Sequence, residues 1–113
     1  MIIAKRMLML RLPTIDVPVP ISLHAPVEGD RCWECRFAIG WPEGERTAIV
    51  RGFDAVQALY LAMQRIAMEL YGSTHHAAGA LSWVEPDGGY GFPMAKAGYQ
   101  DLVGEDRIAQ SPE

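Results

Sequence analysis

The stretch that decides the fold runs from residue 31 to residue 51 and reads RCWECRFAIGWPEGERTAIVR. Large apolar residues alternate with polar or small ones over residues 31–39, which is typical of a strand with one buried face. The Trp-Pro-Glu-Gly run at residues 41–44 is a turn signal. Residues 45–51 then resume as a strand, so the sequence predicts an antiparallel hairpin.

The pairing of this hairpin follows from the turn. If the turn occupies residues 41–44, Glu34 faces Arg51 on the wet face of the hairpin and Cys35 faces Val50 on the dry face. Such cross-strand pairs contribute roughly 0.2–1 kcal/mol each. A slip of one residue would break both matches, so we expect this register.

A long helix is predicted directly after the hairpin. Asp54 is a good N-cap residue, with Gln57 three positions on as in a capping box. Residues 55–71 contain neither Gly nor Pro, and Gly72 is a stop signal. An apolar stripe at helical spacing is expected to lie across the dry face of the sheet: Val56, Leu59, Met63, Ile66 and Leu70.

The N-terminal part of the chain predicts two more strands. Residues 2–12 are apolar, but their impure alternation does not assign the two faces. After a turn at residues 13–16, residues 17–25 alternate cleanly. Pro18 and Pro20 lack donors on the same side of this strand, which predicts an edge strand.

Weaker signals follow the helix. Residues 72–80 are expected to form a loop, residues 81–84 a short strand and residues 90–93 a brief return strand. Residues 95–113 are small, polar and acidic, so a loosely packed or frayed tail is expected.

The fold class follows from this order of elements. One helix (about residues 54–71) among strands joined by short turns predicts an α+β fold, with a single antiparallel sheet of four to five strands and the helix packed on one face. A chain of 113 residues and 12.5 kDa is the size of one domain. We expect that domain to span residues 1–94.

Composition limits the partners. The net charge is −4, with no basic excess of the kind that nucleic-acid binding requires. No apolar run approaches the roughly 20 residues of a membrane helix, and no signal peptide is recognisable. We therefore expect a cytoplasmic protein with protein partners, and with neither a nucleic-acid nor a membrane partner.

Two pairs of residues are of types that can form a disulfide or bind a metal, but their positions favour neither. Cys32 and Cys35 form a CxxC, yet residues three apart on a strand point to opposite faces, too far apart for a disulfide. Cys35 is expected in the core and Cys32 is incidental. His75 and His76 have no third ligand at a metal-site spacing. No catalytic residue, cofactor or metal is predicted, which favours a protein that is not an enzyme.

The outward face of the helix favours a protein interface. Leu61, Met68 and Tyr71 are large and apolar where polar side chains are expected, and Gln64 and Arg65 share this face. This predicts a non-enzymatic interaction domain, acting through the stripe or the sheet's edge as a homodimer, an adaptor or an immunity-type partner. In the alternative, the tail covers the stripe through three apolar residues: Leu102, Val103 and Ile108.

A second hypothesis is a small-molecule site or a weak enzyme near residues 73–93. Trp83, Tyr90 and Phe92 would supply aromatic walls, and His75 or His76 the polar group.

The sequence also resembles a small family of uncharacterised bacterial domains over roughly residues 3–94. The resemblance rests on the strand at residues 35–39, the Gly-Phe-Asp-Ala-Val-Gln-Ala-Leu helix entry at residues 52–59, Trp83, and the Gly-Phe-Pro run at residues 91–93. It implies a small α+β domain and carries over no catalytic residue.

Overall fold

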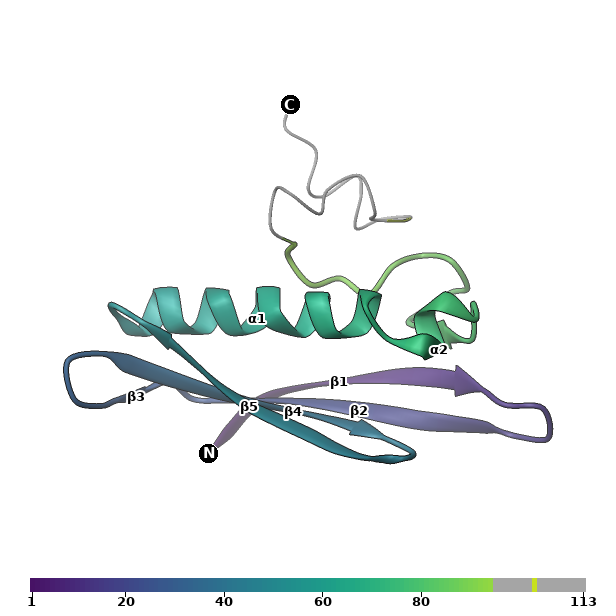
Figure 1. The fold of residues 1–113 in the computed structure, drawn as a ribbon, viewed down its shortest axis with the longest axis horizontal. Helices are drawn as coiled ribbons and strands as arrows, with labels where there is room; N and C mark the ends of the chain where they lie inside the picture. Colours follow the sequence, from purple (N-terminus) through teal and green to yellow (C-terminus); the bar gives the residue numbers. More distant parts are fainter. Residues whose placement is uncertain (95–102, 104–113) are drawn as a thin grey trace.

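The structure, a computed structural model, describes residues 1–94 and residue 103. One antiparallel sheet forms a single layer, and one long helix lies across one of its faces (Figure 1). This confirms the α+β prediction, with six strands rather than four to five. In chain order the elements are β1 (Ile2–Arg11), β2 (Asp16–His24), β3 (Val27–Glu28), β4 (Trp33–Trp41), β5 (Gly44–Gly52), α1 (Ala55–Tyr71), α2 (Thr74–Ala77) and β6 (Leu81–Ser82).

The β4–β5 hairpin has the predicted register. Glu34 pairs with Arg51 and Cys35 with Val50. The first pair is also an ion pair, in which Arg51 Nε lies 3.1 Å from a carboxylate oxygen of Glu34. The loop contains two residues, because Trp41 and Gly44 are already paired. Local alternation and turn chemistry therefore determined this hairpin.

The prediction that residues 17–25 form an edge strand is wrong. β2 lies inside the sheet, between β1 and β4. Its pairing with β4 covers only residues 21–23, whereas its pairing with β1 spans the whole strand. The β4 ladder ends where Pro20 meets Gly40, at which an added Cβ would lie 2.8 Å from the proline ring. The prolines thus limit one ladder of an internal strand.

Helix α1 begins and ends as predicted. The Asp54 side chain accepts a hydrogen bond from the Gln57 backbone N–H, and the Gln57 side chain accepts one from the Phe53 N–H, at 2.8 and 2.7 Å. Gly72 is the C-cap. At the helix start, a Cβ on Gly52 would lie 2.5 Å from the Ala58 nitrogen, so the helix packs very close to β5.

The buried face of α1 differs from the predicted stripe. Ile66 and Leu70 are fully buried, as predicted, but Val56 is 75% exposed. Leu59 and Met63 are only partly buried. Small residues fill the rest of the contact with the sheet, because a helix that approaches a strand backbone closely has no room for larger ones: Ala58, Ala62 and Ala67.

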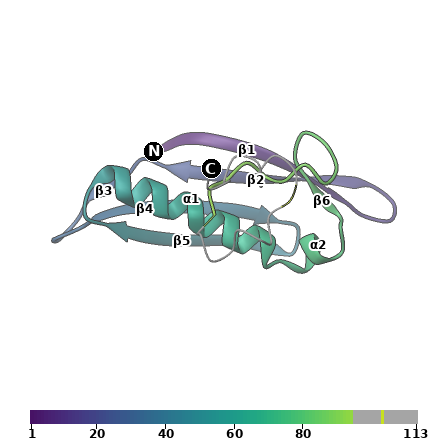
Figure 2. The same cartoon turned by 90° about the horizontal axis from the view of Figure 1, so that it is seen from above.

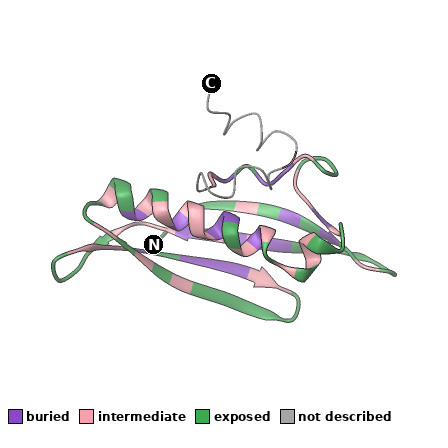
Figure 3. Cartoon of the chain, turned by 45° about the horizontal axis from the view of Figure 1, so that its top comes forward, coloured by how far each residue is buried: buried purple, intermediate pink, exposed green. Residues whose placement is uncertain are grey.

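The core lies between α1 and the sheet, and buried residues gather there (Figure 3). Leu8 and Leu10 of β1 belong to this core and are fully buried. The structure thereby assigns the faces of the first strand, which the sequence left open. The nine side chains that are largest among the fully buried ones come from the sheet and α1: Phe37, Leu8, Leu10, Ile21, Ile39, Ile66, Leu70, Val19 and Cys35.

The segment after α1 differs from its prediction in three places. A short helix, α2, replaces part of the expected loop, and β6 has two residues rather than four. Residues 90–93 form no strand. Gly91 has a positive φ of 78°, and an added Cβ would lie 2.5 Å from the Trp83 ring, so this segment is held by side-chain packing rather than by a ladder. The predicted tail at 95–113, Val103 excepted, lies outside the described residues.

Candidate functional site

Two surfaces of the described residues are exposed and are the candidates for a site: the edge of β5 with the adjoining flank of α1, and the face of the sheet that α1 leaves uncovered. Seen from above, α1 lies over β4 and β5, while residues 81–94 return beside β1 (Figure 2). Strand β5 is exposed along most of its length.

Three charged side chains join α1 to β5. Arg46 of β5 and Arg65 of α1 both bind the Glu69 carboxylate, with closest nitrogen–oxygen distances of 3.1 and 3.3 Å. The hydrogen bonds from Arg46 lower the pKa of Glu69 most, burial opposes them, and the attraction of Arg46 and the hydrogen bond from Arg65 lower the pKa further. This cluster fixes the flank of α1 that lies above the β5 edge.

Most of the predicted stripe lies on or beside this flank. Leu61, Gln64 and Arg65 are half-buried, and Met68 is 52% exposed. Leu61 also lines a hollow of about 400 Å³ beside Gly52 and the exposed Phe53. Met68 lines a different hollow, together with Tyr71, His76 and Met94. The structure therefore places Leu61 next to the end of β5, whereas Met68 borders Tyr71.

Tyr71, by contrast, belongs to a separate aromatic cluster. Its ring lies 4.7 Å from the His76 ring and 5.1 Å from the Tyr90 ring, measured between centroids. His76 Nδ1 and the Tyr90 hydroxyl share a hydrogen bond of 2.6 Å. The Val103 N–H donates to the Tyr71 hydroxyl at 3.5 Å. Leu102 and Ile108, which were expected to cover the stripe, lie outside the described residues.

The five residues of the predicted pocket fall into three groups. His76 and Tyr90 form the cluster just described. His75 stacks on Trp41, with ring centroids 5.1 Å apart, and its Nε2 lies 3.0 Å from the Glu43 carboxylate. A hydrogen bond with the backbone of Glu43 itself, and then one with His75, lower the pKa of Glu43.

Trp83 and Phe92 form the third group. Both rings stack on the Arg6 guanidinium, whose central carbon lies 3.9 Å from the Trp83 centroid and 4.7 Å from the Phe92 centroid. Arg6 also donates to the Tyr90 carbonyl at 3.0 Å. Arg6, which the sequence did not single out, therefore anchors the segment after β6 to the sheet.

The cysteines are free, as expected. Cys35 is fully buried and its thiol donates to the His24 carbonyl at 3.3 Å, while burial raises its pKa. Cys32 precedes β4 and is half-buried. Among the described residues, no three His, Cys, Asp or Glu side chains gather as a metal-ligand set.

The sequence predicted a wet face for the β4–β5 hairpin but no site on the uncovered face of the sheet. Met7 and Met9 of β1 are 55% and 45% exposed, opposite Pro20 and Pro18 of β2. Further along the same face, His24 and Arg36 line a hollow of about 300 Å³. Alternation with the buried Leu8 and Leu10 would have identified Met7 and Met9, had the faces of β1 been assigned.

One family model matches residues 4–94, and its description is "Domain of unknown function (DUF6968)". The chain belongs to this family. No curated protein and no solved structure matches it.

The DUF6968 match contains all the helices and strands of the structure apart from the first two residues of β1. Both surfaces described above therefore lie largely within the residues that the family model matches. Within residues 1–94, no helix is both long enough and apolar enough to cross a membrane. A bacterial origin and a cytoplasmic location stay predictions.

Proposed function

We propose that this DUF6968 domain is a protein-interaction domain whose partner is a second copy of the chain, paired through the edge of β5. The observation that carries the proposal is the sequence of this edge, GERTAIVRG at residues 44–52. It is complementary to itself when two copies run antiparallel.

The outer edge of β5 is open and regular. All nine of its residues pair with β4 without a bulge, and none is a proline. Within the part of the chain that the structure describes, no strand pairs with its other side. The opposite edge of the sheet is better protected, because β1 contains a bulge near Ile2 and pairs with β6. Open edges of this kind are templates for pairing with another chain.

The hydrogen-bond pattern of the β4–β5 hairpin determines which β5 residues can pair with a second copy. In a hairpin with a two-residue loop, the closing pair exchanges hydrogen bonds, and hydrogen-bonded pairs then alternate along the ladder. Trp41 and Gly44 are this closing pair. Residues 45, 47, 49 and 51 therefore direct their backbone N–H and C=O groups outward. A register centred on Ala48 matches these residues with one another.

The same register pairs opposite charges. Glu45 faces Arg51 of the second copy, and symmetry repeats the pair. The Arg51 side chain is 66% exposed and holds Glu34 at 3.1 Å, so one guanidinium would contact two carboxylates. Exposed ion pairs contribute little affinity. They do specify register, because a shift of two residues would separate both pairs.

The flank of α1 supplies apolar area to this contact. Leu61 and Met68 lie seven residues apart on the helix, so they share a side, and Arg65 between them reaches toward β5 through Glu69. In the paired arrangement the two α1 helices run antiparallel above neighbouring β5 strands. Leu61 of one copy then approaches Met68 of the other.

The first test measures the mass of the full chain by light scattering over a range of concentrations. We expect a dimer. The Thr47→Pro variant removes an outward N–H without removing a bond to β4, and it should be monomeric with an unchanged circular dichroism spectrum. The matched Thr47→Val variant keeps the N–H and should stay dimeric. A wild-type chain that is monomeric at every concentration would overturn the proposal.

The second test reports the register directly. In a Cys32→Ser background, Ala48→Cys places two thiols opposite each other at the symmetry axis. The Cα atoms of such a non-hydrogen-bonded pair are ~4.5 Å apart, within reach of a disulfide. Mild oxidation should yield a covalent dimer, whereas Arg46→Cys should yield none. A dimer that survives Thr47→Pro and does not cross-link at position 48 would use another surface.

A further inference from the structure

The hollow on the uncovered face results from a break in the sheet. The β2–β4 ladder ends at Leu23 and Phe37, and the β3–β4 ladder begins at Val27 and Glu34. The chain between these pairs leaves the ladder, so the sheet opens there. The resulting hollow of about 300 Å³ is at the lower end of the range for small-molecule sites.

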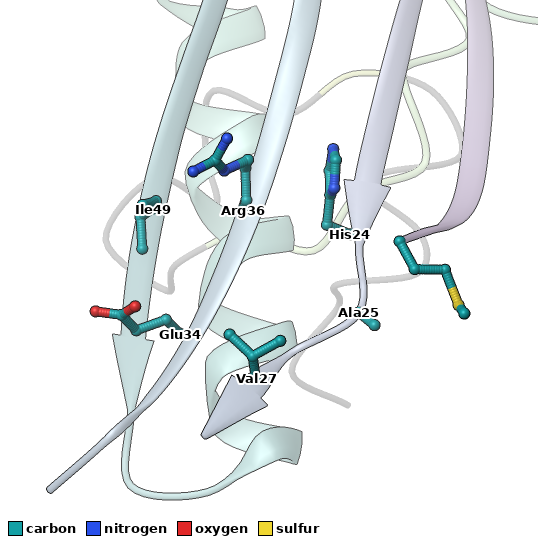
Figure 4. A pocket seen from close by; sticks show the side chains of 7 residues that line it. His24, Ala25, Val27, Glu34, Arg36 and Ile49 are labelled. Carbon is teal, nitrogen blue, oxygen red and sulfur yellow. The ribbon is translucent and has the colours of Figure 1, made fainter. Parts of the chain in front are cut away.

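Two nitrogen-rich side chains enter this hollow from neighbouring strands. Figure 4 shows His24 on β2 and Arg36 on the neighbouring β4, with the Arg36 guanidinium leaning toward Ile49 of β5, and all three residues line the hollow. Within the described residues, neither side chain takes part in an ion pair or a hydrogen bond. Arg36 lies on an exposed part of β4, so its fork of donors faces solvent and is available to a ligand.

The positive charge of Arg36 favours an anionic ligand, and the other groups around the hollow limit which anions fit. Glu34 lies at its far end, where it is held by Arg51 (Figure 4). Its negative charge disfavours a doubly charged ligand. Val27 and Ile49, which are 57% and 42% exposed, add apolar walls. The lining therefore combines the Arg36 guanidinium, which can bind a planar anion, with the apolar surfaces of Val27 and Ile49, which can contact a hydrocarbon tail.

We infer that this hollow binds a monocarboxylate with a short apolar tail. The carboxylate accepts two parallel hydrogen bonds from the Arg36 guanidinium, the geometry that this side chain favours. The His24 ring donates a third bond, and the tail lies against Val27 and Ile49. The site does not depend on the pairing of β5, because Arg36 and His24 belong to a single copy.

The test is a titration of the full chain with valerate, followed through amide chemical shifts. We expect the largest saturable shifts at residues 24, 27 and 36. Arg36→Gln should weaken binding by at least about tenfold, because it removes the positive charge and at least one of the two charge-assisted hydrogen bonds. His24→Leu should weaken it as well. Lys5→Gln removes a charge from the same face without touching the hollow, and should change the affinity by less than about twofold.

Two further probes identify the chemistry. Valeramide has the same tail without the charge, and inorganic phosphate has charge without the tail. The inference requires that valerate bind more tightly than either. It is overturned if valerate causes no saturable shift, if valeramide binds equally well, if phosphate binds more tightly, or if Lys5→Gln weakens binding as much as Arg36→Gln does. An unchanged melting temperature confirms that each variant is folded.

Discussion

The two faces of the sheet are built from adjacent residues, but one face forms the core and the other is exposed. In β1, Leu8 and Leu10 are fully buried on the face that α1 and residues 81–94 cover, whereas Met7 and Met9 are about half exposed on the opposite face. The covered face holds apolar and small residues that fill the space under α1. The uncovered face combines methionines, prolines and charges that no core requires. Stability is therefore concentrated on one face, and the large side chains of the other face take no part in the core.

The largest effect expected from this comparison comes from two neighbours in β1. Leu8→Ala should lower the free energy of unfolding by about 3 kcal/mol, because it leaves a cavity in a closely packed core. Met7→Ala should change it by no more than about 0.5 kcal/mol, since the side chain is already largely in water. Chemical denaturation of both variants measures the difference. Equal losses would show that the uncovered face is buried in solution.

A second comparison uses one glycine from each face. Gly52→Ala places a Cβ 2.5 Å from a backbone nitrogen of α1, which cannot move without the helix, so we expect a loss of about 2 kcal/mol. Gly40→Ala meets the edge of the Pro20 ring at 2.8 Å, and a shift of this ring relieves the contact. A smaller loss is expected there. Thermal unfolding ranks the two, and a larger loss at Gly40 would contradict the rigid role given to α1.

The smallest effect concerns the ion pairs that join α1 to β5. The pKa of Glu69 is lowered in the folded chain, mainly by hydrogen bonds from Arg46. Its contribution to stability is therefore fully present above the ordinary Glu pKa of 4.5 and is lost as the pH falls through the lowered value. The stability difference between the wild type and Glu69→Gln should shrink over that range. A difference that stays constant down to pH 2 would exclude this origin.

Sequence patterns succeeded where the controlling interactions are local. The β4–β5 register depends on a two-residue turn and on alternation that can be read along the chain, and Glu34 and Arg51 meet as predicted. The cap of α1 also involves residues within four positions of one another. Patterns failed at Val56, because the closeness of α1 to Gly52 selects alanines for the contact, and hydrophobicity alone does not reveal that distance.

The candidate sites show the same difference between local interactions, which the sequence predicts, and contacts between distant residues, which it does not. Aromatic and histidine residues at positions 73–93 suggested a single pocket, but their partners are distant in sequence: Arg6 for Trp83 and Phe92, and Glu43 for His75. Pro18 and Pro20 indicated an edge because the sequence does not show that β2 continues past them to pair with β4. Each miss involves a contact that the chain makes only after it has folded.

The sequence by itself determined the hairpin, its register, the limits of α1 and the α+β class, since alternation, turn residues and caps act over a few positions. Only the tertiary structure decided which face of β1 is buried, that β5 is an open edge, and that Arg36 and His24 flank one hollow. These features depend on which strands become neighbours. That choice is made by the burial of the whole apolar face at once, so no short stretch of sequence contains it.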